Sequence, residues 1–401
     1  MLLRLRIKNF KLLRDVDLEV SREAPTVLIG PNASGKSTVI EALDLLGRCA
    51  TDGLELALVA HGGMAAIRTA GSTAPIEIYS HWNFYNPNIK RSCDFHWTLR
   101  IDATTNGLFT IAFESLRDDK IDLLVTSEDG TRLVIDESES DSQPSPITNP
   151  RELGFWAFAD PTRYFRLSFF RATLREIRAL GPLACAPSWA RASTERASPR
   201  DAVSISTQAL VEREGIGLAT ALYNLQTDHH DTWGTLLRAF QAEFPSVERI
   251  VFPPDPAGSR ISFAIEDERF PARKIYASEM SDGMIVYLCL LSLILHPRQR
   301  AVLALDEPDA HLHPSAVRRL MALAHEPAHR HLIIATHSNA LLDELRDPAA
   351  SIRIVETTKE GAQIRKVDAT ALDTWHSEYP LSDLRKTGLL DPTNTAYRTD
   401  P

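Results

Sequence analysis

The chain has 401 residues, of which 44% are hydrophobic and 24% are charged, and its formal net charge is −9. This composition is typical of an ordinary soluble protein with two or three domains, or with one core and a large insertion. The negative charge argues against a protein that binds nucleic acid over its whole surface. A local basic face remains an alternative, because the first fourteen residues include five basic residues and no acidic one.

We expect neither a signal peptide nor a membrane span in this sequence. The start, MLLRLRIKNFKLLR, alternates basic and apolar residues, so it is not a signal peptide. No apolar run approaches the ~20 residues of a membrane span, and we expect a cytoplasmic protein without membrane contact. Four widely spaced cysteines form no metal-like pair, which predicts reduced core thiols. They are Cys49, Cys93, Cys185 and Cys289.

The first fifty residues predict three strands followed by a helix. Residues 2–8 and 15–20 alternate apolar with charged side chains, as half-buried strands do. Residues 27–29 (VLI) are typical of a buried strand. Residues 37–48 carry apolar side chains at helical spacing.

Short strand-like runs separated by turn signals begin at about residue 75 and predict an antiparallel β section. The runs are PIEIYSHWNF, DFHWTLRIDA, LFTIAFESL, IDLLVTS and TRLVIDE. The acidic, Ser/Pro-rich stretch DESESDSQPSPITNP that ends this section predicts an exposed loop.

Residues 162–180 return to helical spacing and predict a helix that carries five arginines. These arginines either form a solvated face, which is the default expectation, or pair with acidic residues, or contact the phosphates of a nucleic acid. Two further helices are expected at residues 207–226 and 230–243. The five arginines are Arg163, Arg166, Arg171, Arg175 and Arg178.

The final third alternates strands with helices and predicts a parallel sheet covered on both faces. The expected strands are RISFAIED, AVLALDEP and LIIATHS, and the expected helices are SDGMIVYLCLLSLILH and SAVRRLMALAH. SIRIVETT and AQIRKVD, joined by KEG, predict a closing hairpin.

Residues 30–37 (GPNASGKS) match the pattern G-x-x-x-x-G-K-[ST] in full, between an apolar strand and a helix as the pattern requires. The glycines let successive N–H groups converge on one anion, and the helix adds its positive end. Lys36 is expected to reach the β- and γ-phosphates of a nucleoside triphosphate, and the Ser37 hydroxyl is expected to bind Mg²⁺. The predicted nucleotide-binding residues here are Gly30, Asn32, Ser34, Gly35, Lys36, Ser37 and Thr38.

Two later strands end in polar residues. The strand VLALDE ends at Asp306, expected to hold Mg²⁺ directly or through water, and Glu307, expected to orient and deprotonate the attacking water. The strand at IIATHS ends at His337, expected to hydrogen-bond the γ-phosphate or that water. A strand ending in Asp-Glu also occurs by chance, but with a phosphate-binding loop upstream it indicates nucleotide hydrolysis.

Residues 306–314 (DEPDAHLHP), followed by ATHS at 335–338, resemble the ABC-class ATPase heads of the RecF, SMC and OLD group. The chain is most similar to stand-alone AAA-type ATPases that resemble OLD proteins without their nuclease. This resemblance implies an α/β P-loop NTPase fold with a mixed sheet, an inserted antiparallel β section and a helical lobe. It also implies that Asp309 lies in a D-loop touching a partner subunit and that His337 is the switch histidine. His311 and His313 lie in the same segment without a third ligand nearby, so we prefer the D-loop interpretation to a metal pair.

The resemblance assigns two further segments. The opening IKNFK is similar to the first-strand NFK of these heads, which places Lys11 near the nucleotide. Ser281 and Gly283, in SDG 25 residues before Asp306, match the signature motif that opens a helix. In such heads the serine contacts the γ-phosphate bound by the other subunit, so two chains would sandwich two ATP molecules in a homodimer. Serine and aspartate also cap helices of any kind, and that interpretation stays open.

The sequence departs from this group in three respects. No glutamine occurs between Ser37 and Gln143, so no Q-loop residue can be placed. Lys36 and Ser281 are 245 positions apart, too few for the coiled-coil arms of SMC proteins and too many for a compact transporter ATPase. The 64 residues after His337 are expected to be too few for the Toprim nuclease of OLD proteins.

The sequence therefore predicts a Mg²⁺-dependent ATPase that works as a switch, in which ATP joins two heads and hydrolysis releases them. By family analogy it would act on DNA or on an effector protein such as a nuclease, in DNA maintenance or anti-phage defence. A nuclease acting alone and a transporter ATPase are the alternatives. The expected domains are the ATPase core (1–74 and 246–370), the β section (75–150), the helical lobe (151–245) and a tail (371–401).

Overall fold

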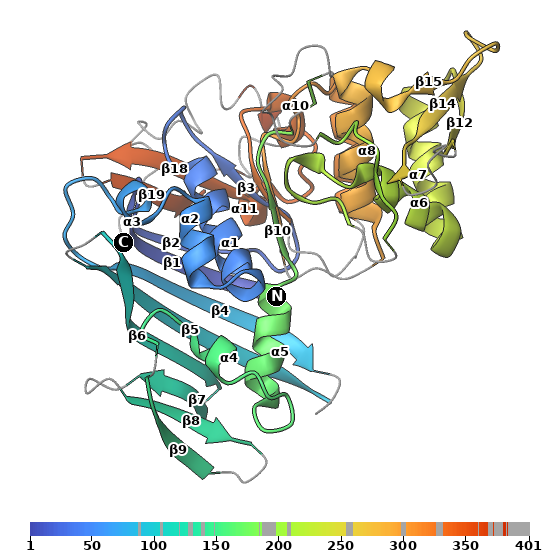
Figure 1. The fold of residues 1–401 in the computed structure, drawn as a ribbon. Helices are drawn as coiled ribbons and strands as arrows, with labels where there is room; N and C mark the ends of the chain where they lie inside the picture. Colours follow the sequence, from blue (N-terminus) through green and yellow to red (C-terminus); the bar gives the residue numbers. More distant parts are fainter. Residues whose placement is uncertain are drawn as a thin grey trace.

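Two large β-sheets and a group of helices make up the fold (Figure 1). The antiparallel sheet lies at one end of the molecule and the helices α6 (Leu218–Asp228), α7 (His230–Glu243) and α8 (Asp282–Leu295) lie at the other, with the second sheet between them. The computed structural model describes residues 1–86, 90–104, 107–119, 121–126, 131–137, 141–147, 149–183, 185–186, 198–206, 210–253, 260–297, 302–325, 332–359 and 361–367, and residues 372, 380, 381 and 383.

The first sheet has eight strands in the order β2-β1-β4-β5-β6-β7-β8-β9, and each described pair of neighbours is antiparallel. It confirms the predicted antiparallel section and adds the two opening strands to it. Its strands are β1 (Leu2–Phe10), β2 (Leu13–Glu19), β4 (Ile76–Asn86), β5 (Arg91–Ala103), β6 (Phe109–Asp118), β7 (Ile121–Thr126), β8 (Thr131–Asp136) and β9 (Asp141–Pro146).

The predicted loop at DESESDSQPSPITNP is wrong for residues 141–146, which form strand β9. This strand pairs with β8 from Asp136↔Asp141 to Thr131↔Pro146 and lies at the end of the sheet. An edge strand needs backbone pairing on one side only, so proline and polar residues are tolerated there. The acidic, Ser/Pro-rich composition of this segment therefore predicted a loop where the chain forms an edge strand.

One face of this sheet is covered by helices, as Figure 1 shows for α1, α4 and α5. Alternate residues of β4 and β5, such as Trp82, Phe95 and Trp97, are fully buried in one apolar cluster with residues of these helices. The Trp97 ring lies 5.8 Å from that of Phe170. The helices on this side are α1 (Lys36–Thr51), α2 (Leu54–Ala60), α3 (Met64–Ile67), α4 (Gly154–Ala157) and α5 (Phe165–Leu174).

The second sheet has the order β10-β16-β17-β3-β18-β19, and all its pairs are parallel except β18–β19. The parallel sheet and the closing hairpin are thus confirmed. RISFAIED, in contrast, forms two short strands outside this sheet. The six strands are β3 (Thr26–Ile29), β10 (Ile177–Leu180), β16 (Val302–Asp306), β17 (Leu332–Ala335), β18 (Ile352–Thr358) and β19 (Gly361–Lys366).

The predicted helix at 162–180 is wrong at both ends, because α5 covers only Phe165–Leu174 and Ile177–Leu180 is strand β10. β10 pairs in parallel with β16 from Ile177↔Val302 to Leu180↔Leu305. Gly47 of α1 faces Ile177, where an added Cβ would lie 3.3 Å from the Ile177 Cβ. Pairing with a buried strand and packing under α1 outweigh the local helical pattern.

The remaining helices and short strands complete the fold; α11 contacts β3 of the second sheet, whereas α6, α7 and α8 pack against one another. The helix predicted at 207–226 begins only at Leu218, although residues 207–209 lie outside the described residues, and the helix at 230–243 is confirmed. These elements are α6 (Leu218–Asp228), α7 (His230–Glu243), α8 (Asp282–Leu295), α9 (Pro314–Ala324), α10 (Asn339–Leu342), α11 (Pro348–Ser351), η2 (Arg213–Gly215), η3 (Ala277–Glu279), β11 (Val203–Ser204), β12 (Val247–Val251), β13 (Arg260–Ile261), β14 (Ala264–Asp267) and β15 (Ile275–Tyr276).

All four cysteines are buried and free, as predicted for core thiols. Among the described residues, no helix combines the length and the apolar character needed to cross a bilayer.

Candidate active site

The loop between β3 and α1 encloses the Lys36 side chain. Gly35 has φ 109°, a conformation that favours glycine, and α1 begins at the next residue without a side-chain cap. The Lys36 ammonium donates hydrogen bonds to the carbonyl oxygens of Gly30 (3.1 Å) and Pro31 (2.9 Å), and only 4% of the residue is exposed. The loop thus concentrates a cation and the amide end of a helix at one point.

A cavity of about 310 Å³ lies over this loop. It is lined by most residues predicted to act on nucleotide, which arrive from β3–α1, from the end of β16 and from the end of β17. Leu12, which was not predicted, also lines it and is 46% exposed. The predicted residues that line it are Asn32, Ser34, Gly35, Lys36, Ser37, Thr38, Glu307 and His337.

Glu307 follows β16 in an unusual backbone conformation. Its φ is 49°, in the left-handed region that a glutamate rarely adopts, and its amide donates to the Ala335 carbonyl at 2.8 Å. Its carboxylate accepts a hydrogen bond from the His337 amide at 3.3 Å and lies 3.6 Å from the His337 Nε2. Strained residues of this kind cluster at functional sites, so the conformation itself supports a role for Glu307.

Asp306 and Glu307 are both harder to ionise than in water. Burial raises the pKa of Asp306, with the Ser37 side chain and Lys36 opposing the shift. Burial also raises the pKa of Glu307, against the opposing hydrogen bond from the His337 amide. Within the described part of the chain, the buried Asp306 Oδ1 and Ser34 Oγ have no hydrogen-bond partner. Carboxylate and hydroxyl oxygens are the ligands that Mg²⁺ prefers, so Ser37 and Asp306 fit this ion.

Asp309, Ser281 and Gly283 lie outside the residues that line this cavity. Asp309 accepts a hydrogen bond from the Thr336 hydroxyl at 2.5 Å, which ties its loop to the end of β17. Ser281 is the exposed N-cap of α8 and accepts from the Met284 amide at 3.3 Å. The structure therefore presents the predicted signature serine on the surface, away from the phosphate-binding loop of its own chain.

The start of α8 is held by a residue that the sequence patterns did not reveal. The buried Arg200 guanidinium donates to the carbonyl oxygens of Cys185 (2.6 Å), Ala277 (2.7 Å) and Met280 (2.7 Å), and to the Asp282 carboxylate (2.5 Å). Its side chain is 2% exposed. An arginine in an Ala/Ser/Pro/Arg-rich segment gives no sequence signal for such a role, because its partners are up to 82 positions away.

Gly283 lies against the loop that follows Glu307. An added Cβ at Gly283 would stand 2.8 Å from the His311 carbonyl oxygen, closer than real Cβ atoms come. His311 itself has φ 68°. The glycine of the SDG segment is thus explained by close packing within one chain.

Lys11 does not reach the cavity. Its ammonium binds the Glu41 carboxylate of α1, and its backbone amide donates to the Ile67 carbonyl oxygen at 2.7 Å. The structure therefore places Leu12, and not Lys11, at the cavity wall.

The local basic faces considered from the sequence are largely neutralised. Arg4 binds Asp17 at 2.5 Å and Arg6 binds Asp15 at 2.9 Å, because β2 supplies acids opposite the bases of β1. Arg163 binds Asp136 at 2.6 Å, and Arg166 binds Glu137 and, at 3.2 Å, Asp118. Of the predicted alternatives, pairing with acidic residues is confirmed for Arg163 and Arg166.

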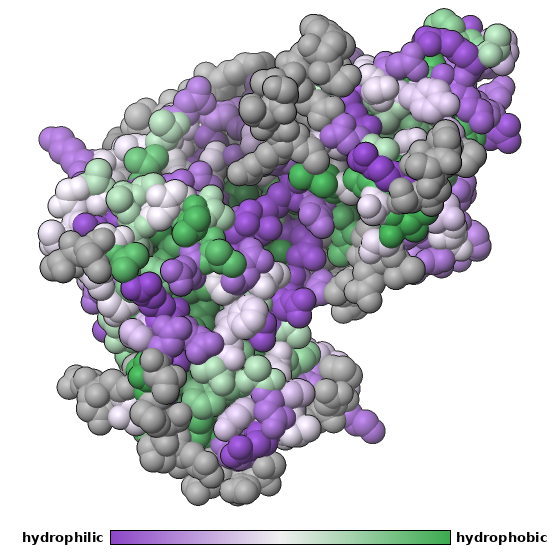
Figure 2. Space-filling view, viewed as in Figure 1, coloured by the Kyte–Doolittle hydropathy of each residue, from purple (hydrophilic) through white to green (hydrophobic). Residues whose placement is uncertain are grey.

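A second, larger cavity of about 690 Å³ lies between the end of α1, β10 and residues of the segments 203–206 and 210–220. Figure 2 shows hydrophilic residues gathered in a hollow over this part of the molecule. None of the residues predicted to act on nucleotide lines it. We therefore take the smaller cavity, over the phosphate-binding loop, as the candidate active site.

Comparisons with known proteins give ATPase families over two parts of the chain. Residues 1–135 match the family described as "AAA ATPase domain", and residues 157–343 match "AAA domain, putative AbiEii toxin, Type IV TA system". Over 46 residues the chain is 46% identical to an OLD nuclease of Thermus scotoductus. That stretch is 12% of this chain and 8% of the nuclease, so the chain matches only a small part of that relative's length.

Solved structures give the fold. The crystal structure of an SMC head bound to the C-winged helix domain of ScpA superposes with a TM-score of 0.50 at 15% identity, over 92% of this chain and 99% of that one. The SMC head domain from Thermotoga maritima covers the same shares at 15% identity with a TM-score of 0.43, too low to add to the argument. The chain has the fold of an SMC head and resembles the ABC-class ATPases of the OLD and SMC group, and its family matches support ATPase activity.

Proposed function

We propose that this chain is a Mg²⁺-dependent ATPase that works as a switch, in which two copies close on bound ATP and separate after hydrolysis. The observation that carries the proposal is the convergence of Lys36, Glu307 and His337 on one cavity, from the start of α1 and from just beyond the ends of β16 and β17. A loop that binds phosphate for structural reasons alone has no need of the two groups at the ends of β16 and β17.

The chemistry follows from the position of each group. Lys36 and the open amides of α1 attract the β- and γ-phosphates, and they favour the charge that develops during phosphoryl transfer. Glu307, once ionised, accepts a proton from water on the γ-phosphate side of the cavity. His337 lies 3.6 Å from that carboxylate and is placed to hold the terminal phosphate or the same water. Mg²⁺ held by Ser37 and Asp306 would neutralise phosphate charge.

The proposed dimer rests on the exposed position of Ser281. Its hydroxyl and the first amides of α8 form a helix N-terminus outside the cavity of their own chain, a place suited to receive an anion. In the family that this chain resembles, the equivalent serine contacts the nucleotide of the other subunit. A symmetric pair of chains would then complete two sites at once.

The partner of the switch is proposed by analogy. The similar SMC head was crystallised with a domain of ScpA bound to it, and the OLD relative is a nuclease. We therefore propose that ATP-driven closure recruits an effector protein, with roles in DNA maintenance or anti-phage defence. Direct DNA contact through the arginines of 163–178 is less favoured, because Arg163 and Arg166 are already paired with acids.

The dimer is tested by trapping it before hydrolysis. Glu307→Gln removes the base but keeps the shape of the side chain, so turnover should fall at least about 100-fold while ATP binding persists. Sedimentation of this variant with ATP and Mg²⁺ should show a dimer. Adding Ser281→Arg should abolish the dimer and leave ATP binding intact, whereas the control Ser92→Arg, on an exposed position of β5, should not.

Two results would contradict this proposal. Dimerisation of the Ser281→Arg variant on ATP would show that the serine is not at the interface. Metal-dependent DNA cleavage by the purified protein, independent of ATP, would instead favour the nuclease alternative.

A further inference from the structure

Two imidazoles and one carboxylate gather on the antiparallel sheet, on the face opposite α1. His81 of β4 lies directly across from His96 of β5, and Asp94 is two residues from His96 on the same strand. Side chains two apart on a strand share a face. Their chain neighbours Trp82 and Phe95 face the opposite side, in the apolar cluster that includes residues of α1, and are fully buried.

The three side chains bring their ligand atoms together. His81 Nε2 lies 2.7 Å from Asp94 Oδ1, and His96 Nε2 lies 3.6 Å from Asp94 Oδ2. The two imidazole rings stack at 4.2 Å. One ligand atom from each residue can be chosen so that all three lie within 4.8 Å of one another, and this is the one such group of three or more among the described residues.

We propose that His81, Asp94 and His96 form a binding site for a divalent transition-metal ion, represented here by Zn²⁺. Tetrahedral coordination at ~2.0–2.1 Å places ligand atoms roughly 3.3 Å apart. The separation of 3.6 Å is already close to this value, and the separation of 2.7 Å must open by about half an ångström, within the reach of a rotamer adjustment. Imidazole nitrogen selects Zn²⁺, Cu²⁺ or Ni²⁺ over Mg²⁺, which prefers oxygen ligands.

Neighbouring side chains orient the ligands. The Tyr79 hydroxyl is hydrogen-bonded to His96 Nδ1 at 2.8 Å, which leaves Nε2 directed at Asp94. The Asn83 amide donates to Asp94 Oδ1 at 3.4 Å. Partners of this kind, which fix the second nitrogen of a ligating histidine, are usual around protein metal sites. All five residues lie on two adjacent strands near the middle of the sheet, which makes the scaffold rigid.

The cluster is open to solvent on one side. The exposed fractions of the His81, Asp94 and His96 side chains are 22%, 31% and 30%. Three protein ligands with an accessible fourth position are typical of sites that bind a water or a substrate group on zinc, whereas structural zinc sites are closed by four protein ligands. The site also lies on the far face of the sheet from α1 and the phosphate-binding loop, so its occupancy is measurable without nucleotide.

The test is metal binding by the full, tag-free and nucleotide-free chain. Competition with a chromophoric zinc chelator should show one tight Zn²⁺ equivalent per chain, and Co²⁺ should give the visible absorption of a four-coordinate site. His81→Ala and His96→Gln should each weaken Zn²⁺ binding by more than about 100-fold, and Tyr79→Phe by about 10-fold, since it removes only an orienting partner.

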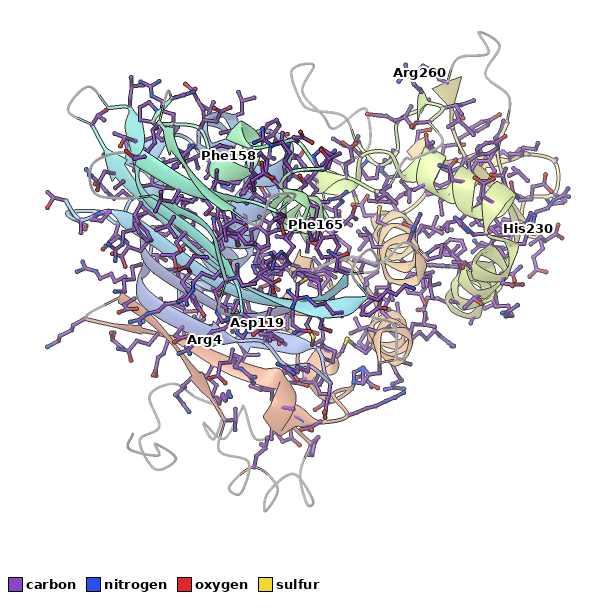
Figure 3. The ribbon with its side chains drawn as sticks, turned by 90° about the horizontal axis from the view of Figure 1, so that it is seen from below. Arg4, Asp119, Phe158, Phe165, His230 and Arg260 are labelled. Carbon is purple, nitrogen blue, oxygen red and sulfur yellow. The ribbon has the colours of Figure 1, made fainter. Side chains whose placement is uncertain are left out.

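The matched control is His230→Ala. His230 is an exposed histidine at the start of α7, far from Arg4 and the antiparallel sheet (Figure 3), and its loss should leave both stoichiometry and affinity unchanged. Unchanged far-UV circular dichroism and ATP binding show that each variant is folded. The proposal is overturned if the parent binds no tight equivalent of Zn²⁺, or if tight binding survives in the His81→Ala/His96→Gln double variant. In either case the cluster is only a hydrogen-bonded group on the surface of the sheet.

Discussion

The two sheets of this molecule use polar residues in different ways. On the antiparallel sheet, charged side chains on the solvent-exposed face form ion pairs between neighbouring strands, as Arg4–Asp17 and Arg6–Asp15 do. In the second sheet the central strands β16 and β17 are apolar along their length, and the polar residues Asp306 and His337 come at or just after the ends of these strands. Figure 3 shows Arg4 among the strands, on the side away from Phe158 and Phe165.

This difference follows from how each sheet is covered. A sheet with one solvated face can distribute charge evenly over that face, and each charge is then nearly neutral for stability. When both faces of a sheet are covered, polar groups are accommodated mainly beyond the ends of its strands. The polar residues are therefore concentrated in one place. Chemistry is therefore expected at the ends of β3, β16 and β17, and little effect is expected from the paired charges of β1 and β2.

The largest expected effect is at Lys36. Lys36→Ala removes the buried cation of the phosphate-binding loop, and ATP affinity and turnover should both fall at least about 100-fold. Isothermal titration with ATP and a phosphate-release assay measure the two. Arg6→Ala, which removes a cation of the antiparallel sheet, is the control and should change neither. If Arg6→Ala lowered ATP affinity and turnover as much as Lys36→Ala, the two sheets would not differ in their contribution to ATP binding.

A large effect on stability is expected at Arg200. Arg200→Met leaves the carbonyl oxygens of Cys185, Ala277 and Met280 buried without their donor, and it should lower the free energy of unfolding by about 3–5 kcal/mol. Arg200→Lys keeps the charge but not the fork of donors, so it should recover only part of this loss. Urea denaturation measures both variants. A change below about 1 kcal/mol in Arg200→Met would show that this guanidinium does not hold the start of α8.

A smaller and pH-dependent effect is expected at Asp44, which joins α1 to the segment before α6. Burial alone would raise its pKa, but His61, Arg213 and Arg48 together lower it to about 2. A pKa below the unfolded value near 3.8 stabilises the fold above that pH, and the gain is lost as the pH falls toward 2. Asp44→Asn should therefore cost about 2 kcal/mol at pH 7.

The pH profile provides the check on Asp44. Between pH 4 and pH 2 the difference in the free energy of unfolding between the parent and Asp44→Asn should shrink. Asp52→Asn, whose carboxylate lies 3.6 Å from Arg48 and is 37% exposed, is the matched control with little expected change. A difference that is constant across this range would mean that Asp44 acts through its shape and not its charge.

The smallest effect is expected from Arg4 and Asp17. Both side chains are well exposed, at 48% and 35%, so a double-mutant cycle with Arg4→Ala and Asp17→Ala should give a coupling of about 0.2–1 kcal/mol. This coupling should decrease in high salt. A coupling of several kcal/mol would mean that this exposed ion pair stabilises the fold as much as the buried Arg200 does, which would contradict the expectation for paired charges on the antiparallel sheet.

Local patterns predicted much of the fold and most of the residues around the cavity. The segment from Val27 to Leu43 is predictable because a strand, a glycine-rich turn and a helix follow one another without help from distant residues. The strand end at Asp306 and Glu307 is predictable because an apolar run gives way abruptly to two acids.

The errors arose where distant partners decide the structure. Ile177–Leu180 became a strand because β16 offered an open edge 125 positions away, between Ile177 and Val302, and Asp141–Pro146 became a strand because β8 did. The role of Arg200 could not be predicted, because the carbonyl groups that it binds, those of Cys185, Ala277 and Met280, come near it only in the folded chain.

The close approach of Gly283 to His311 has a mechanical consequence. Because no side chain fills the space between the first turn of α8 and the carbonyl of His311, the helix and the loop after Glu307 have no slack between them. A side chain at position 283 would therefore push the first turn of α8 and the His311 carbonyl apart.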